Sequence, residues 1–186
     1  MSTAPIQSPV QSPVLIPVLD TPRFILRGHV LSDFDACAAM WAHPDVTRFI
    51  GGRPFSRSET WARLLRYHGH WAMLGYGFWV VEDKATGAFL GEVGLADFRR
   101  EIEPPFGDAP EMGWSLAPAA HGKGVASEAV AAAAAWGDAN LKSDRFVCII
   151  APENGASIRV AEKVGFRELR RTEYGGAPTI VFERRR

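Results

Sequence analysis

The chain has 186 residues, of which 47% are hydrophobic and 23% charged, and this composition is typical of one globular domain. Basic and acidic residues number 21 each, so no net charge draws the protein toward nucleic acid or an anionic membrane surface, and we expect neither as a partner. The apolar runs are too short for a membrane span. Only two cysteines occur, Cys37 and Cys148, which argues against a disulfide framework and a cysteine-ligated metal site and favours a cytoplasmic protein.

The N-terminal region differs in composition from the rest of the chain. Residues 1–18 are rich in Ser, Pro and Gln and lack the pattern of a secretory signal, so we expect a flexible tail followed by one domain over residues 19–186. The apolar pieces 14–16 and 18–19 leave open a second arrangement, in which part of the tail lies against the domain.

The first half of the domain reads as one strand, two helices and a hairpin. A strand is expected over residues 24–29, after the turn pair Thr21-Pro22. Ser32 is expected to cap a helix that ends near Ala42, and Ser58 a second helix through His68. The β-rich runs 78–82 and 89–95 flank a short polar segment and predict a hairpin. Residues 97–110 then form a long loop, and loops of this length are often functional.

The second half contains a β-α-β unit. Strands are predicted over residues 111–116 and 145–151, on either side of an alanine-rich helix over residues 125–140. A shorter helix over residues 157–164 and two strands over 166–171 and 179–183 complete the chain. Strands and helices in this order predict a single α+β domain.

The turn between the first strand and the helix of this unit is the sharpest chemical feature. It reads His121-Gly122-Lys123-Gly124-Val125-Ala126-Ser127. Two glycines allow a tight turn and close approach of a ligand, while a helix start offers unpaired N–H groups, so a phosphate is the expected guest. A P-loop would need Ser or Thr directly after Lys123, and a dinucleotide fingerprint would need Gly or Ala at Ser127, so both alternatives fail.

This turn resembles the pyrophosphate loop of the GNAT acetyltransferase superfamily, in which Gln or Arg precedes the pattern Gly-x-Gly/Ala. His121 departs from that pattern, and Gly124 and Ala126 match it. Further matches follow in the same order along the chain, and with Thr21-Pro22-Arg23 they are most similar to the RimJ/RimL-like branch: Glu111-Met112-Gly113-Trp114-Ser115-Leu116, Asn154-Gly155-Ala156-Ser157 and Lys163-Val164-Gly165-Phe166.

The resemblance implies a GNAT-like mixed, mostly antiparallel central sheet flanked by helices, with the β-α-β unit binding acetyl-CoA. It implies that the pyrophosphate lies on the turn and that pantetheine lies between the two parallel strands. The cofactor-binding residues implied are Trp114, Ser115, Leu116, His121, Gly122, Lys123, Gly124, Val125, Ala126, Ser127, Asn154 and Ser157.

Acyl transfer needs a proton donor near the thiolate and a means of deprotonating the amine. Ser157 is the first choice near the sulfur, although it could equally cap the last helix. Glu111 is the first candidate base and Glu92 the second, and exposure at a strand end is the alternative for each. For Trp114, packing in the core is preferred to a chemical role. His43, His68, His70 and His121 lack the spacing of a zinc site, so no metal is expected.

The expected function is therefore transfer of an acetyl group from acetyl-CoA to a primary amine by direct attack. The acceptor is either a protein N-terminus or a small amine such as a polyamine, amino acid or aminoglycoside, and the protein is expected to be a monomer or homodimer. Fold analogy cannot name the acceptor. The rival from another class is a non-catalytic acyl-CoA sensor, which would keep the cofactor site without turnover.

Overall fold

The computed structural model describes residues 14–186 and contains an eight-stranded sheet in the order β1-β2-β3-β4-β5-β6-β8-β7. Strands β1 (Leu19–Asp20), β2 (Phe24–Arg27), β3 (Phe78–Asp83), β4 (Phe89–Ala96) and β5 (Glu111–Leu116) pair antiparallel in turn. At the other end, β6 (Arg145–Ile150), β8 (Ala177–Arg185) and β7 (Arg167–Tyr174) are also antiparallel. The expected mixed, mostly antiparallel sheet is confirmed.

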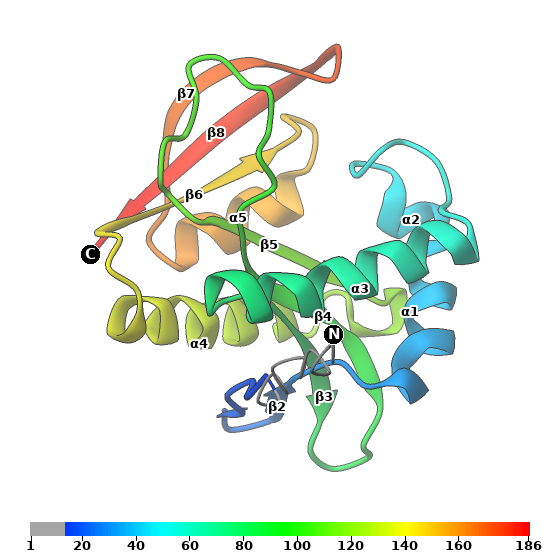
Figure 1. Ribbon diagram of the computed structural model, residues 1–186. Coiled ribbons are helices and arrows are strands. Elements are labelled where there is room, and N and C mark those ends of the chain that lie inside the picture. The colour runs from blue at the N-terminus through cyan, green and yellow to red at the C-terminus, as the bar shows by residue number, and fades with distance from the viewer. Residues whose placement is uncertain (1–13) are drawn as a thin grey trace, which may run out of the picture.

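The two halves of the sheet meet at its parallel pair, β5 and β6. Their ladder has a single residue pair, Glu111 with Val147. Beyond that pair the strands diverge, as Figure 1 shows. The remaining length of β5 therefore has a ladder on its β4 side alone, and its other edge is available to a ligand.

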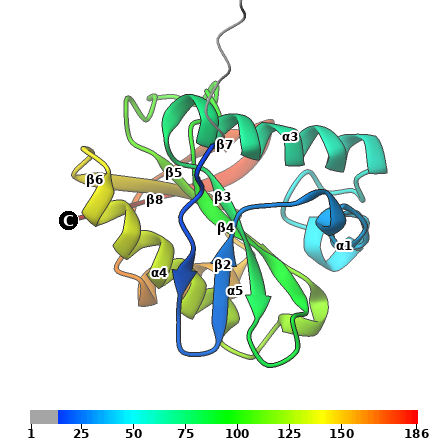
Figure 2. The same ribbon diagram turned by 60° about the horizontal axis from the view of Figure 1, so that its bottom comes forward.

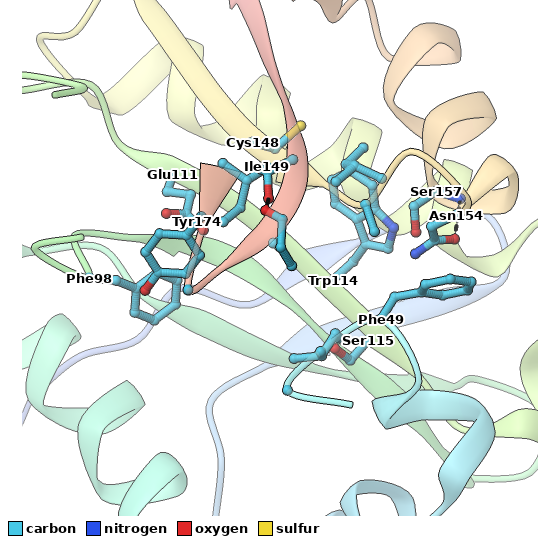
Figure 3. A pocket seen from close by; sticks show the side chains of 18 of the residues that line it. Phe49, Phe98, Glu111, Trp114, Ser115, Cys148, Ile149, Asn154, Ser157 and Tyr174 are labelled. Atoms are coloured by element: carbon cyan, nitrogen blue, oxygen red, sulfur yellow. Dashed lines mark hydrogen bonds between the residues drawn. The ribbon is translucent and has the colours of Figure 1, made fainter. Parts of the chain in front are cut away.

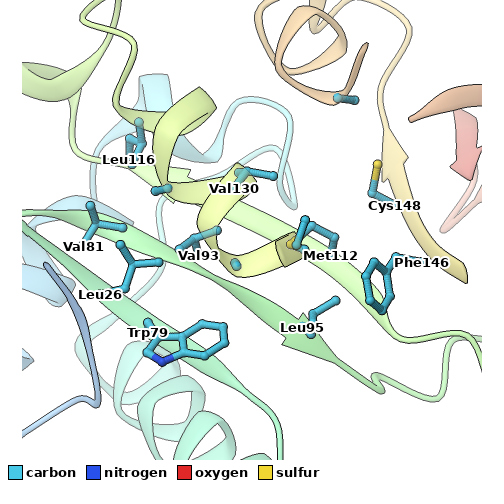
Figure 4. Packing of buried hydrophobic residues seen from close by; sticks show 14 of the residues in the cluster. Leu26, Trp79, Val81, Val93, Leu95, Met112, Leu116, Val130, Phe146 and Cys148 are labelled. Atoms are coloured by element: carbon cyan, nitrogen blue, oxygen red, sulfur yellow. The ribbon is translucent and has the colours of Figure 1, made fainter. Parts of the chain in front are cut away.

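Helix α4 (Val125–Asn140) covers one face of the sheet. Its alanines Ala129, Ala133 and Ala134 are almost completely buried in the main core. Figure 4 shows Val130 of the same helix above the apolar side chains of the strands. Gly137 continues this close contact, because a Cβ on Gly137 would lie 2.7 Å from Phe146. The alanine-rich sequence therefore serves close helix–sheet packing, which fixes where α4 begins relative to β5.

The opposite face carries α1 (Phe34–Trp41) and α3 (Arg57–Leu74), which lie across the sheet from α4 (Figure 2). A 3-10 turn, η1 (Leu31–Asp33), precedes α1, and the short α2 (Pro44–Thr47) follows it. The remaining pieces are the 3-10 turn η2 (Pro118–Ala120) and α5 (Gly155–Lys163). Within residues 14–186 there is no helix with the length and hydrophobicity needed to cross a membrane.

Three helix starts differ from expectation. Ser32 lies inside η1, and the carboxylate of Asp33 accepts a hydrogen bond from the Val30 N–H at 2.8 Å. Helix α3 begins after Ser56, whose side chain and that of Glu59 form a reciprocal capping box, so the expected cap at Ser58 was wrong. Helix α5 is capped by Asn154 and not by Ser157. At α3 and α5 a neighbouring polar side chain takes the capping role, whereas no side chain of the described residues caps α1.

Part of the expected tail packs on the domain. Val14 and Ile16 contact the main core, and the Trp79 indole N–H donates to the carbonyl of Pro17 at 2.8 Å. Residues 1–13 lie outside the described residues. The apolar piece 14–16 therefore covers the sheet near β3.

Candidate active site

A cleft of about 710 Å³ opens where β5 and β6 diverge. Its walls come from β5, from β6 and the start of α5, from the β7–β8 turn, and from the segment between α1 and α3. Figure 3 shows Glu111, Tyr174 and Phe98 together at one end, and Asn154 and Ser157 at the other. We call these the Glu111 end and the Ser157 end of the cleft.

The Ser157 end is organised by the start of α5. The side-chain Oδ1 of Asn154 accepts a hydrogen bond from the main-chain N–H of Ser157 at 3.2 Å, so Asn154 is the helix cap. The Ser157 hydroxyl has no hydrogen-bond partner among residues 14–186, although it lines the cleft. It is free to bind a ligand.

Strand β5 supplies the floor of the cleft. Trp114 and Ser115 line it, whereas Leu116 is buried in the main core behind it. Trp114 also packs against that core, so its packing and cleft-lining roles coexist. The three residues expected to contact a cofactor thus divide into two that line the cleft and one that supports it.

The glycine turn has the backbone conformation that the sequence predicts. Gly122 and Gly124 have φ of 73° and 76°, in the left-handed region that side chains with a Cβ avoid. Gly124 is the residue before α4, and no side chain caps this helix. Residues 121–124 are exposed. The amides of Val125, Ala126 and Ser127, which have no intrahelical acceptor, and the turn before them could therefore hold a phosphate.

His121 does not point its ring toward this turn's free amides. Its Nε2 lies 2.9 Å from the main-chain oxygen of Leu116, at the end of β5. Lys123 is exposed, and its carbonyl accepts a hydrogen bond from the Arg23 guanidinium at 2.9 Å. The His121 side chain therefore joins the turn to the end of β5.

At the other end of the cleft, Glu111 is buried and paired with Arg100. The Arg100 guanidinium binds both carboxylate oxygens, with an Nη2–Oε1 distance of 2.7 Å. Its Cζ lies 4.8 Å from the ring centre of Phe98 and 4.9 Å from that of Tyr174. Burial raises the pKa of Glu111, and the hydrogen bonds from Arg100 oppose that shift without cancelling it. A carboxylate of this kind is more basic than an exposed one.

Glu92 lies elsewhere. It is 1% exposed and does not line the cleft. Its carboxylate lies 3.1 Å from the His29 Nε2 and accepts a hydrogen bond from the Trp41 indole at 2.9 Å and another from the Cys37 thiol at 3.4 Å. Burial opposes ionisation, but the hydrogen bonds with His29 and Trp41 outweigh it and hold the pKa of Glu92 below its ordinary value. This position does not support Glu92 as a base. The hydrogen bonds of Glu92 with Cys37 and Trp41 instead join β4 to α1.

The same cluster contains metal-ligand atom types that the sequence spacing does not reveal. The His29 nitrogen, Cys37 sulfur and a Glu92 oxygen lie within 4.8 Å of one another. In the arrangement described here they are joined by hydrogen bonds. The four histidines considered from the sequence are not part of this group.

Sequence reasoning missed many of the cleft residues, among them Phe49, Arg63, Arg100 and Tyr174. Arg100 lies in the long loop after β4, whose length and acidity were the available signal. Tyr174 directly precedes Gly175-Gly176, which marks a turn but not its position beside the cleft. Phe49 lies in the segment between α2 and α3 and Arg63 lies on α3, and no local pattern indicates that either side chain reaches the cleft.

Comparison with known proteins agrees with this architecture. Residues 23–167 match the family model described as an acetyltransferase (GNAT) domain. The chain is 35% identical over 145 residues to the uncharacterised protein YkkB of Bacillus subtilis, covering 76% of this chain and 80% of that one. A solved GNAT-family protein of Bordetella pertussis is similar with a TM-score of 0.80 and 33% identity, over 91% of this chain and 99% of that one.

RimL, a ribosomal L7/L12 α-N-protein acetyltransferase solved with coenzyme A, has the same fold at 17% identity, with a TM-score of 0.74 over 91% of this chain and 98% of that one. Together, the matched domain, the relatives and the sheet that diverges between β5 and β6 identify the chain as a member of the GNAT acetyltransferase family, which uses acetyl-CoA as the acyl donor.

Proposed function

We propose that this acetyltransferase moves the acetyl group of acetyl-CoA directly onto a primary amine, and that the amine is the α-amine of a peptide or protein. The main support is the cleft between the diverging strands β5 and β6, together with the uncapped glycine turn at the start of α4. Bound acetyl-CoA supplies an activated thioester, so the protein has to align a neutral amine with it and return a proton to the thiolate.

The donor half of the reaction is assigned to the Ser157 end. The turn Gly122–Ser127 would hold the diphosphate through main-chain amides, while Trp114, Ser115 and Asn154 would contact the pantetheine arm. Leu116 and His121 support this site from behind, through the bond between the Leu116 carbonyl and the His121 ring.

Ser157 is assigned the proton relay to the thiolate. A CoA thiol resembles cysteine, with a pKa of about 8.5, so a hydroxyl hydrogen bond is sufficient and a strong acid is unnecessary. The free Ser157 hydroxyl fits this role, because the hydrogen bond that Asn154 needs as a helix cap comes from the main-chain N–H of Ser157. The serine can serve a ligand without loosening the helix cap.

Glu111 is assigned the removal of a proton from the attacking amine, directly or through water. Its raised pKa makes it a better base than an exposed glutamate. Arg100 holds the carboxylate in place, and each oxygen keeps a lone pair for a further hydrogen bond. An α-amine needs only modest help, because its pKa of about 8 leaves an appreciable neutral fraction at pH 7.

The charges that line the cleft favour an α-amine over a polycation. Its arginines are Arg48, Arg63 and Arg100, and its acids are Glu111 and Glu153. Because Arg100 is already paired with Glu111, a polyamine would meet more positive than negative charge. An α-amine followed by carbonyl groups, or an amino acid with its own carboxylate, is compatible with this lining.

The test is a screen for thiol release from acetyl-CoA with three acceptors: a peptide with a free N-terminus, a free amino acid and a polyamine. We expect the peptide to react fastest and the polyamine slowest. A polyamine that outpaced both α-amines would contradict the acceptor assignment. Tight CoA binding without thiol release for any acceptor would favour the acyl-CoA sensor instead.

A further inference from the structure

The glycine turn lacks the Gln or Arg side chain that its family pattern places at position 121. His121 occupies that position, and its ring nitrogen is engaged with the carbonyl of Leu116 at 2.9 Å. Apart from the exposed Lys123, the turn itself offers a diphosphate only main-chain amides, so a second cation would have to come from elsewhere in the chain. Arg23, which is distant in sequence, lies directly against the turn.

Arg23 stands just before β2 and is held by the first turns of α4. Its Nη1 donates to the Lys123 carbonyl at 2.9 Å, and its Nε donates to a Glu128 oxygen at 2.7 Å. The other Glu128 oxygen accepts hydrogen bonds from the Arg23 main-chain N–H at 2.9 Å and from the Thr21 hydroxyl at 2.7 Å. Two hydrogen bonds from the guanidinium, and two more that hold Glu128 against Thr21 and the Arg23 main chain, therefore fix the guanidinium relative to the helix start.

The third guanidinium nitrogen remains available. Among residues 14–186 no acceptor is bound to Nη2 of Arg23, and this atom would lie 3.3 Å from a Cβ built on Gly124. The side chain is 50% exposed. A planar cation with free N–H groups thus lies beside uncapped helix amides, a combination suited to phosphate oxygens.

We propose that Arg23 is the cation that binds the diphosphate of acetyl-CoA, in place of the residue at position 121. Glu128 and Thr21 orient the guanidinium, and the Lys123 carbonyl ties it to the turn. The proposal rests on the proposed function only in that CoA is the ligand; it does not depend on the acceptor. Two of the segments that resemble the family, Thr21-Pro22-Arg23 and the glycine turn, also meet in space.

The experiment measures binding of CoA, 3′-dephospho-CoA and pantetheine to the full chain by calorimetry. Arg23→Met keeps much of the aliphatic stem and removes the cation, and Arg23→Lys keeps a charge without the planar fork. Arg171→Met is the matched control, because Arg171 forms an ion pair with a glutamate on β7, away from the turn. Unfolding temperatures of all variants check that the domain is intact.

For Arg23→Met we expect the Kd of CoA and of 3′-dephospho-CoA to rise about tenfold to hundredfold, with an intermediate rise for Arg23→Lys. Pantetheine, which lacks the diphosphate, should bind all variants equally, and Arg171→Met should behave like the wild type. Equal weakening of pantetheine and CoA would overturn the proposal, because Arg23 would then act on the fold alone. A loss confined to CoA would also overturn it, by assigning Arg23 to the 3′-phosphate. A wild-type chain that bound none of the three ligands would contradict the donor assignment itself, whereas CoA binding without turnover would contradict only the proposed function.

Discussion

Replacing Glu92 with glutamine tests whether this buried carboxylate stabilises the fold or serves the reaction. The substitution preserves shape and removes the charge that His29, Cys37 and Trp41 surround. An amide oxygen can still accept the indole N–H, but it forms a weaker bond, and the amide nitrogen must face the remaining partners. Hydrogen bonds to a charged group contribute about 1.5–3 kcal/mol each, and breaking a buried pair costs about 3–5 kcal/mol.

We therefore expect Glu92→Gln to lower the free energy of unfolding by about 2–4 kcal/mol at pH 7. For a chain of this size that corresponds to a decrease in Tm of about 5–15 °C. Because the pKa of Glu92 is lowered in the folded state, its contribution is present above the unfolded pKa and disappears as pH falls through the lowered value. The difference in free energy of unfolding between the wild type and the variant should accordingly decrease below about pH 4.

The assay is urea unfolding followed by tryptophan fluorescence at pH 7 and at acidic pH, with Glu168→Gln as control. Glu168 is an exposed partner of Arg171, and its replacement should leave the stability nearly unchanged. A loss below about 1 kcal/mol for Glu92→Gln would refute the structural role. Lost turnover with unchanged stability would return Glu92 to the list of catalytic candidates.

Three further substitutions test the cleft. Ser157→Ala should lower kcat about tenfold to hundredfold while the KM for acetyl-CoA changes little, because the Asn154 cap binds the main chain and survives. Unchanged steady-state kinetics would remove Ser157 from the proton relay. Glu111→Gln should move the pH–rate profile to higher pH. Wild-type activity rises as Glu111 ionises through its raised pKa, whereas the activity of the variant rises only as the amine itself loses its proton. Superimposable profiles would exclude Glu111 as the base. Gly124→Val puts a branched residue at φ of 76°, which should cost about 1–3 kcal/mol of stability and weaken CoA binding in calorimetry; undiminished affinity would contradict the phosphate assignment.

The features that could be predicted from the sequence are those with a local cause. The apolar strand 145–150 and the alanine-rich helix 125–140 each carry their own periodicity, and the glycines of the turn require a left-handed backbone. These elements define the β-α-β unit and the expected phosphate site at the start of α4. The long loop 97–110 was likewise identified by its prolines and polarity.

The side-chain network could not be predicted, because its contacts join distant segments. Glu92 meets His29 and Trp41 from separate elements, and Arg23 meets Glu128 across more than half the chain. No periodicity encodes such pairs. From the sequence alone Glu92 is a candidate base, and its burial among hydrogen-bond donors changes that interpretation. The misassigned helix caps have a smaller cause, since two serines near α3 fit the local pattern almost equally.

The most direct test of acetyl transfer combines two readings on the wild-type chain: calorimetric binding of CoA, and mass spectrometry of a peptide with a free N-terminus after incubation with acetyl-CoA. We predict saturable CoA binding and a peptide acetylated on its α-amine at a rate that depends on the concentration of chain. CoA binding with every tested amine left unmodified would contradict the central claim, and the cleft between β5 and β6 would then be a site for sensing acyl-CoA.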